Sequence, residues 1–220
     1  MRPLFLLAVF SLILHLDLYA QNSYNQMSDT PNPELAAPRF LTTQVASTHP
    51  DFAYTYNLEK WRSQRAASIA ATEEHPRPLR WYIPDLRFRI TANWIPSGFA
   101  GSLAVPNTLG QITDESSPGM AEFVLYGQTV RLFPIANGQS GLLFLFRDAT
   151  SKTSTQVEGR ILHADPPSQG IGRTGNVVLD FNRAENPPCA YSPGAVCSLP
   201  PQQNRLTIPI PAGEQRYSVD

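Results

Sequence analysis

Apolar and polar residues alternate strictly over residues 86–94, LRFRITANW, where leucine, phenylalanine, isoleucine, alanine and tryptophan are separated by arginine, threonine and asparagine. A period of two places successive side chains on opposite faces, so this pattern predicts a strand with one buried and one solvated face. Other apolar segments, bounded by connections marked with glycine and proline, predict further strands at residues 101–105, 120–127, 129–135, 141–148, 157–164, 176–182 and 205–210. The segment 141–148, GLLFLFRD, is apolar on both faces, and we expect it in the centre of a sheet or between two layers.

One helix is predicted before the strands, from Asp51 to about Thr72. Thr48 and Asp51 stand in a capping-box-like relation, and Pro50 fits the first turn of the helix. The apolar positions available to face a sheet are Phe52, Tyr56, Trp61 and Ile69.

The order of the predicted elements indicates the fold class. One helix is followed by many short strands, alternating βα units are absent, and the chain has 21 prolines, which long helices do not tolerate. These features predict a mainly β protein, either an antiparallel β-sandwich or a partly open barrel, with one N-terminal helix. We expect Trp61 to lay the helix against a sheet while Arg62 and Arg65 extend their charged ends to water. A ligand-binding pair of arginines is the alternative.

The first twenty residues have the pattern of a signal peptide. Arg2 precedes an apolar run from Leu4 to about Leu14, and Ala20 offers a small residue before a cleavage point. A membrane anchor is the alternative, but a spanning helix needs roughly twenty apolar residues, and this run is shorter. We therefore expect residues 1–20 to be removed and the mature protein to be secreted or periplasmic in a bacterium, without a transmembrane segment.

Residues 21–47 are polar, broken by prolines and without periodicity, so they predict a disordered leader ahead of a single β-rich domain at residues 48–220. The formal net charge of the chain is −1, and only 16% of its residues are charged. No basic stripe is present, and a nucleic-acid partner is therefore not expected.

Cys189 and Cys197 are the two cysteines of the chain. Pro193 and Gly194 between them favour a turn, and in an oxidising compartment so close a pair usually closes a loop. We therefore predict a disulfide. A zinc site is one alternative, but zinc normally takes four ligands at tight spacings, and His163 is the only plausible third ligand. A catalytic thiol is the other, and no Cys–His constellation supports it.

Polar side chains gather at the ends of three predicted strands and in the connections that follow. Because loops on a rigid β scaffold commonly carry sites, these residues could crowd one rim of the fold if their strands are neighbours. The alternative is structural, since aspartate and asparagine cap turns and an arginine between carboxylates is a common clamp. The candidate ligand-binding residues are Asp148, Thr150, Arg160, His163, Asp180, Asn182 and Asn186.

Sequence motifs of the common enzyme chemistries are missing. The chain has no Gly-x-Ser-x-Gly elbow, phosphate-binding glycine loop, HExxH pair or calcium loop. We therefore assign no catalytic residue, and we expect neither a metal nor a cofactor.

The tail GNVVLDFNRAENPPCAYSPGAVCSLPPQQNRLTIPIPAGEQRY, residues 175–217, resembles the ending of the domain of unknown function 1684 family of bacterial and archaeal proteins. That family ends in an LDFN-like strand, NPPCA, a second cysteine before LPP, then N-R-L and AGE. The stretches FRDATS, WYIPDLRFRITANW and EKWRSQRAAS are also similar to the family. The resemblance extends from about Phe52 to Tyr217. It implies a fold but no function, because the biochemistry of the family is unknown.

The resemblance also has departures. Family members usually carry a β-rich segment between the WRxxR helix and the strand at residues 86–94, and this chain resembles a shortened member that lacks part of it. Gln156, Glu185 and Ser198 stand where the family tends to have tyrosine, an aromatic residue and proline. Relatives keep the cysteine pair without always being exported, which leaves a thiol or metal role open.

Two functions remain. The first is an exported, non-catalytic binding or envelope-associated β module whose partner is a small molecule or an envelope component. The second is a hydrolase-like enzyme for small ligands that uses Asp148, Arg160 and Asp180, with Arg160 holding an anionic group, a carboxylate handling protons and His163 available as a base. The enzyme requires the three residues to converge in one concave pocket.

Overall fold

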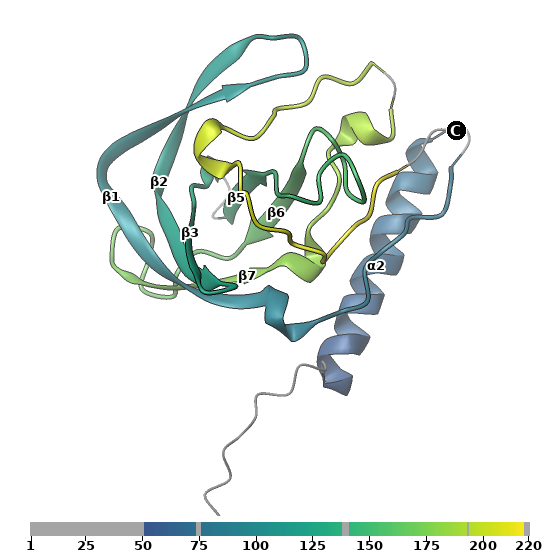
Figure 1. The fold of residues 1–220 in the computed structure, drawn as a ribbon, viewed down its shortest axis with the longest axis horizontal. Helices are drawn as coiled ribbons and strands as arrows, with labels where there is room; N and C mark the ends of the chain where they lie inside the picture. The colour runs from purple at the N-terminus through teal and green to yellow at the C-terminus, as the bar shows by residue number, and fades with distance from the viewer. Residues whose placement is uncertain (1–50, 74–75, 138–140, 193, 218–220) are drawn as a thin grey trace, which may run out of the picture. The chain divides into compact units, whose positions relative to one another are not determined.

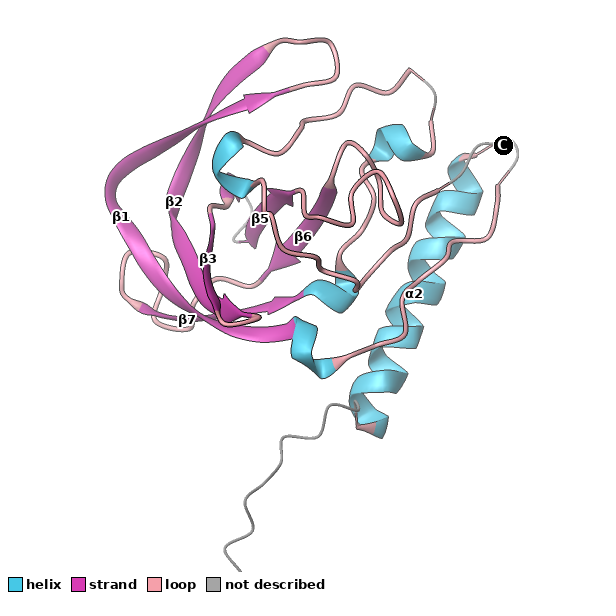
Figure 2. Ribbon diagram, in the orientation of Figure 1, coloured by secondary structure: helices cyan, strands magenta, loops and turns pink. Residues whose placement is uncertain are grey.

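The computed structural model describes residues 51–73, 76–137, 141–192 and 194–217. The predicted signal peptide and leader lie outside these ranges, as do Thr48 and Pro50 of the predicted helix start. The elements of the fold, traced in Figure 1 and coloured by type in Figure 2, are α2 (Phe52–Thr72), η1 (Leu86–Phe88), β1 (Arg89–Pro106), β2 (Ile112–Leu125), β3 (Gln128–Leu132), β4 (Ile135–Asn137), β5 (Gly141–Phe146), β6 (Arg160–Ala164), β7 (Gly175–Asp180), η2 (Phe181–Arg183), η3 (Pro188–Ala190) and η4 (Gln202–Asn204).

The strands form two antiparallel sheets. One sheet has the order β3-β2-β1-β7 and the other the order β4-β5-β6. Within the described part of the chain no ladder joins the two sheets into a closed barrel. The mainly β, sandwich-like or partly open architecture with one helix, predicted from the alternation of apolar residues, is therefore confirmed.

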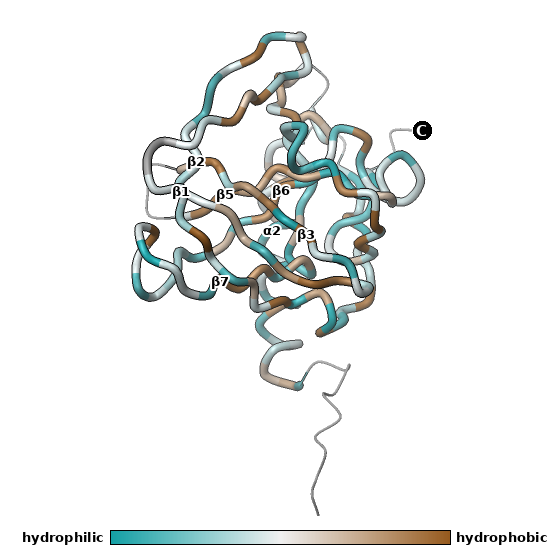
Figure 3. Tube along the Cα trace, turned by 60° about the vertical axis from the view of Figure 1, so that its left-hand side comes forward, coloured by the Kyte–Doolittle hydropathy of each residue, from teal (hydrophilic) through white to brown (hydrophobic). Residues whose placement is uncertain are grey.

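Two apolar clusters lie on the two faces of the three-stranded sheet. The larger takes Trp94, Phe123 and Leu132 from one sheet and Phe144 and Phe146 from the other, so it fills the space between them. The smaller contains Leu145, with Leu143 packed against it. Since Leu143 and Leu145 alternate with the phenylalanines, β5 is covered on both faces, as its sequence predicts. The apolar stretch at β5 is visible in Figure 3.

The long strand β1 serves both clusters. It joins two segments that the sequence predicts as separate strands, except that the first three residues of the segment 86–94 form the 3-10 helix η1. Its pairing with β2 shifts register between Pro96 and Gly101. Before the shift β1 contributes Trp94 to the larger cluster, and after it Leu103 and Val105 to the smaller. A register irregularity bends a strand and re-aims its side chains, so this bend carries the β1–β2 hairpin over the second face of β5.

The helix α2 differs in detail from its prediction. Asp51 is its N-cap and accepts a hydrogen bond from the Tyr54 amide, so it does not occupy the third helical position of a capping box. The apolar stripe is also different, because Phe52 and Tyr56 are 85% and 61% exposed. The buried side chains are those of Leu58 and Arg62.

The tryptophan of the helix packs against a ring outside both sheets, whereas the sequence predicted that it would lie against a sheet. Trp61 meets Trp81 edge to face, with ring centroids 5.5 Å apart. The buried Arg62 lies 4.9 Å from the centroid of the Trp81 ring, and its Nη2 donates to the Tyr82 carbonyl. Burial lowers the pKa of Arg62. Arg62 therefore packs against the protein instead of reaching water.

The prediction of a strand at residues 205–210 is wrong. The segment makes only one isolated bridge, between Arg147 and Arg205, although Leu206 N–H donates to the Arg147 carbonyl at 2.7 Å. Pro209 has no amide hydrogen and cannot continue a ladder. The segment nevertheless buries Ile208 and Ile210 in the larger cluster. Residues 204–214, here called the C-terminal strap, run along the end of β5.

Candidate functional site

The carboxylate of Asp148 and the guanidinium of Arg160 form a buried ion pair. Nη2 of Arg160 lies 2.6 Å from Oδ2 of Asp148, and the two side chains are 1% and 0% exposed, respectively. The guanidinium also donates to the Ala212 and Ile210 carbonyls, the second at 2.9 Å, and stacks on the Phe146 ring. A charge leaves water at this depth only when it is paired and hydrogen-bonded, and these contacts join β6 to the C-terminal strap.

The other oxygen of Asp148 organises the turn after β5. It accepts hydrogen bonds from the Thr150 amide at 2.7 Å and the Thr150 hydroxyl at 2.6 Å. It also accepts from the Ile210 amide at 3.2 Å. Thr150 then meets the Thr155 hydroxyl at 2.9 Å. Asp148 is thus surrounded by protein groups, which favours the structural role over a ligand-binding one.

Asp180 and Asn182 close the end of β7. The Asp180 carboxylate accepts from the Tyr54 hydroxyl of α2 and from the Asn182 amide. The Asn182 side chain bonds both backbone groups of Asp85, which fixes the chain entering η1. Burial and the Asp180 charge both raise the pKa of Tyr54.

Asn186 belongs to a polar network between α2 and the C-terminal strap. Its amide donates to Oε2 of the buried Glu214 at 2.7 Å, and its carbonyl accepts from Arg65 at 3.0 Å. Glu214 also accepts from the Tyr191 hydroxyl and pairs with Nε of Arg65 at 3.2 Å. Burial raises the pKa values of Glu214 and Tyr191. Arg65, whose pKa is raised by its carboxylate partners against the effect of burial, is thus an interior clamp.

His163 stands at the surface end of the same network. Its side chain is 58% exposed, and its Nε2 lies 3.2 Å from Oε1 of Glu185. The other oxygen of Glu185 lies 2.6 Å from Nη1 of Arg65. Glu185 is half-buried beside Ile161, with which it forms an isolated bridge.

The seven candidates therefore fall into three groups. Asp148, Thr150 and Arg160 lie together under the strap, as the adjacency of their strands suggested. Asp180 and Asn182 join β7 to η1, and Asn186 and His163 are connected through Arg65. The convergence of Asp148, Arg160 and Asp180 in one pocket, which the enzyme hypothesis requires, is not seen among the described contacts. A ligand-binding role for the seven residues stays a prediction.

The disulfide between Cys189 and Cys197 is present, with the two Cα atoms 5.8 Å apart. Its loop touches two distant parts of the fold. Ser192 donates to Glu73 at the end of α2, while the Cys197 amide and carbonyl bond Thr108 in the β1–β2 turn. No group of described His, Cys, Asp and Glu residues has the geometry to hold a metal ion.

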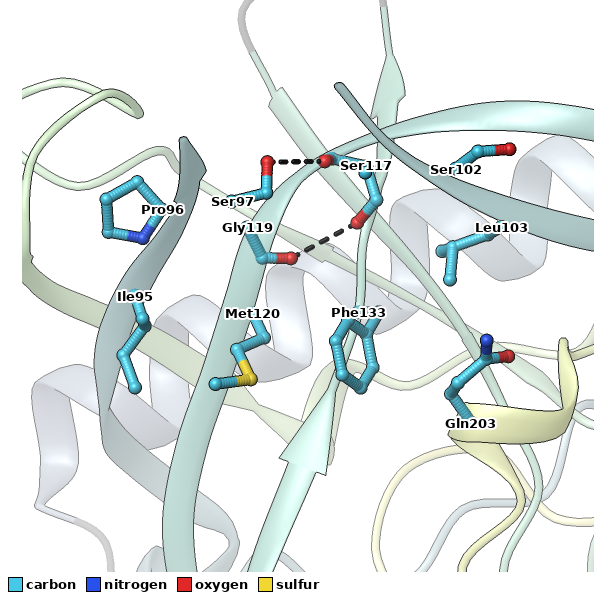
Figure 4. A pocket seen from close by; sticks show the side chains of 11 residues that line it. Ile95, Pro96, Ser97, Ser102, Leu103, Ser117, Gly119, Met120, Phe133 and Gln203 are labelled. Carbon is cyan, nitrogen blue, oxygen red and sulfur yellow. Dashed lines mark hydrogen bonds between the residues drawn. The ribbon is translucent and has the colours of Figure 1, made fainter. Parts of the chain in front are cut away.

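A cavity of about 350 Å³ lies beside the bend of β1 (Figure 4). Three segments surround it, namely the bent β1–β2 hairpin, the residue after β3, and η4. Its lining residues are Ile95, Pro96, Ser97, Gly101, Ser102, Leu103, Ser117, Gly119, Met120, Phe133 and Gln203. None of the seven residues proposed from the sequence is among them.

Close backbone packing forms one wall of this cavity. A Cβ atom on Gly119 would lie 2.5 Å from the Ile95 carbonyl oxygen and 2.7 Å from the Trp94 ring, so only glycine allows β1 and β2 to approach here. Ile95 pairs with Met120 in the ladder between β1 and β2. Ala121 pairs with Leu132, the last residue of β3, so Phe133 lies beside Met120. These three side chains form an apolar row along the cavity.

The polar groups of the cavity are few and uncharged. The Ser97 hydroxyl donates to the Ser117 carbonyl at 3.0 Å, and the Ser117 hydroxyl donates to the Gly119 carbonyl at 3.1 Å. The lining contains no Asp, Glu, His, Cys, Lys or Arg. The described lining therefore offers hydroxyl, amide and backbone groups for hydrogen bonds beside an apolar surface.

Sequence reasoning missed these residues, although a signal was present. The alternation of β1 is interrupted at Pro96-Ser97-Gly98, and that of β2 at Ser117-Pro118-Gly119. Proline and glycine inside a strand pattern indicate a bulge or a close approach of two backbones.

The fold and the cavity define a small β-sandwich-like scaffold with one disulfide-closed loop and a C-terminal strap. Residues 73–215 match the family described as "Protein of unknown function (DUF1684)", and the chain belongs to that family. The resemblance noted in the tail is therefore confirmed. None of the curated proteins matches the chain.

Solved structures share the fold, and one of them is from an archaeon. It is the solution NMR structure of the uncharacterized protein from gene locus rrnAC0354 of Haloarcula marismortui, which matches with a TM-score of 0.58 and 24% sequence identity. The match covers 74% of this chain and 94% of that one. At this identity the likeness supports the fold alone.

Among the described residues, none of the helices has the length and apolar character needed to cross a bilayer.

Proposed function

We propose that this protein is an exported, non-catalytic β module that binds a small apolar molecule in the cavity beside the bend of β1. The cavity itself carries the proposal. Its volume of about 350 Å³ falls within the range of small-ligand sites, roughly 300–1,000 Å³. Apolar side chains with a few well-placed polar groups are the usual lining of such sites.

Two features support export. The first twenty residues have the charge and apolar run of a signal peptide, and the Cys189–Cys197 disulfide suits an oxidising compartment. The test is the intact mass of the protein recovered from the periplasm or medium of an export-competent bacterial host. A chain that begins near Gln21 is expected, and a chain that stays in the membrane fraction with residues 1–20 attached would contradict export.

Binding is tested with N-phenyl-1-naphthylamine, an uncharged probe whose fluorescence rises in apolar surroundings. The exported chain is expected to bind the probe in a saturable manner. The Met120→Trp variant places a larger side chain in the apolar row and is expected to weaken binding at least about tenfold, because overpacking removes the space that the ligand needs.

A matched control comes from the same strand. Val124, which is 66% exposed, lies on the same face of β2 as Met120 and does not line the cavity. Val124→Trp is expected to bind the probe like the wild type, and urea unfolding of both variants verifies that they are folded. Wild-type binding that Met120→Trp leaves unchanged, or no saturable wild-type binding, would overturn the proposed site.

A further inference from the structure

The chemical class of the ligand can be inferred from the hydrogen bonds of the cavity, on the basis of the proposed binding function. Its lining residues carry no charge. Ser97, Ser102 and Gln203 of the lining are exposed to water. An ionised carboxylate or ammonium group that moved past them, against Leu103 and Phe133, would lose water without gaining a partner of opposite charge, which is unfavourable. The part of the ligand inside the cavity is therefore uncharged.

The serine hydroxyls decide which polar group the ligand must bring. A hydroxyl has one hydrogen to donate and two lone pairs to accept. The Ser97 hydroxyl donates its hydrogen to the Ser117 carbonyl, and the Ser117 hydroxyl donates its hydrogen to the Gly119 carbonyl. Both oxygens, visible with their bonds in Figure 4, keep lone pairs that only a donor can use. A ligand that lacks a donor would leave these acceptors unpaired as it displaces water.

The rest of the cavity selects an apolar body. Ile95, Met120 and Phe133 form a continuous row, and Leu103 closes the far side. A methionine thioether adapts to alkyl chains and to rings. The amide of Gln203, which has no hydrogen bond within the described chain, lies apart from Ser97 in Figure 4 and is free to meet a second polar group.

We infer that the cavity takes an uncharged molecule with an alkyl or aryl body and a hydroxyl or N–H donor placed at Ser97 and Ser117. Long-chain alcohols and neutral aryl amines or amides belong to this class. A fatty-acid anion or an organic phosphate whose charged group would lie against the two serines does not.

Competition against bound N-phenyl-1-naphthylamine tests the class with three compounds of matched size. 1-Octanol and 1-methoxyheptane are isomers that differ in whether their oxygen carries a donor, and octanoate adds a charge to the same chain. 1-Octanol is expected to displace the probe at a concentration about fivefold to tenfold lower than the ether, the effect of roughly one hydrogen bond. Octanoate is expected to fail at the highest concentration at which the ether competes.

Two variants connect the donor preference to its acceptor. Ser97→Ala is expected to bring the affinity for 1-octanol down to that for 1-methoxyheptane while leaving the ether unchanged. Ser116→Ala is the control, because Ser116 is exposed on the neighbouring strand and does not line the cavity. A preference for 1-octanol that survives in Ser97→Ala would overturn the assignment to this serine.

The outcomes separate the ligand class from the proposed function. If octanoate competes as well as 1-octanol, or if none of the three displaces a probe whose binding depends on Met120, the inferred class is wrong and the cavity remains a binding site. If probe binding is insensitive to Met120→Trp, the proposed function itself fails. A signal from carbon-13 in the Met120 methyl group, assigned by its loss in Met120→Leu, is expected to shift with 1-octanol and gives a second readout at the cavity wall.

Discussion

The Tyr54 hydroxyl donates to both oxygens of the Asp180 carboxylate, at 2.8 and 3.0 Å. This contact joins the first turn of α2 to the end of β7. Arg89 and Arg183 lie beside the same carboxylate at 4.0 and 3.8 Å. Asp180, proposed from the sequence as a ligand-binding residue, is thus engaged in docking the helix.

Tyr54→Phe removes this contact while keeping the ring. We expect the free energy of unfolding to fall by about 0.5–1.5 kcal/mol, the usual net contribution of one hydrogen bond, and amide exchange in α2 to accelerate. Urea unfolding and hydrogen exchange provide the measurements. Tyr56→Phe is the control, since Tyr56 is exposed on the same helix. Equal losses in the two variants would show that the Asp180 contact does not hold the helix.

Arg160→Met leaves Asp148 buried without its cation and removes the donors to the strap carbonyls. Breaking a buried pair in this way typically destabilises a protein by about 3–5 kcal/mol. The matched control is Arg131→Met, which breaks the more exposed pair with Glu122 and is expected to change stability by about 0–1 kcal/mol. Similar denaturation midpoints for the two variants would contradict the clamp.

Reduction of the Cys189–Cys197 disulfide is expected to lower the free energy of unfolding by about 2–3 kcal/mol, because the open loop regains conformational entropy in the unfolded chain. Alkylation followed by mass analysis should block two thiols only after reduction. The Cys189→Ala/Cys197→Ala double variant should already have the lower stability and should not respond to the reductant. A response by that variant would place the effect elsewhere.

Gly119→Ala tests the close approach that forms the cavity wall. Because its Cβ would meet the Ile95 carbonyl and the Trp94 ring, we expect a loss of about 1–3 kcal/mol, as for overpacked interiors, and weaker probe binding. Gly172→Ala is the control, since no heavy atom lies within 4 Å of its Cβ position. Thermal unfolding of both variants is the measurement, and a neutral Gly119→Ala would mean that β1 can move away without consequence.

Glu214 predicts a pH dependence of stability. Burial raises its pKa above the ordinary value of 4.5, so folding favours the protonated carboxyl. Its contribution is therefore fully present below pH 4.5 and is lost as the pH rises through the raised pKa. The unfolding free energy of the wild type minus that of Glu214→Gln is expected to decrease as the pH rises above the ordinary pKa of 4.5. A difference that grows with pH would show that Arg65 outweighs burial.

The sequence predicted the features that depend on local patterns. The period of two in residues 86–94 places Ala92 and Trp94 in the core, and the two-sided apolar run at residues 141–148 becomes the covered strand β5. The spacing of the two cysteines predicted the disulfide correctly. In each case a short segment contains the information that decides the outcome.

The cavity depends on distant segments and could not be predicted in this way. Phe133 and Gln203 are far apart in the sequence, and both line the cavity with Met120 where β1 bends. The interior position of Glu214 likewise depends on Arg65, which lies 149 residues earlier. The helical period also gave no sign that Phe52 and Tyr56 would be exposed, because both positions fit the apolar stripe of the predicted helix.

The C-terminal strap has a consequence for how the chain reaches its native state. Asn204 bonds the backbone around Phe133 and Leu145, while Ile210 and Glu214 complete contacts of Arg160 and Arg65. Such long-range contacts form only after the intervening chain has been brought together. The domain can therefore close only when the chain up to residue 214 is available to pack. A truncation that removes only the last few of these residues would take partners of Arg160 and Arg65 away and leave donors of both guanidinium groups unpaired in the interior.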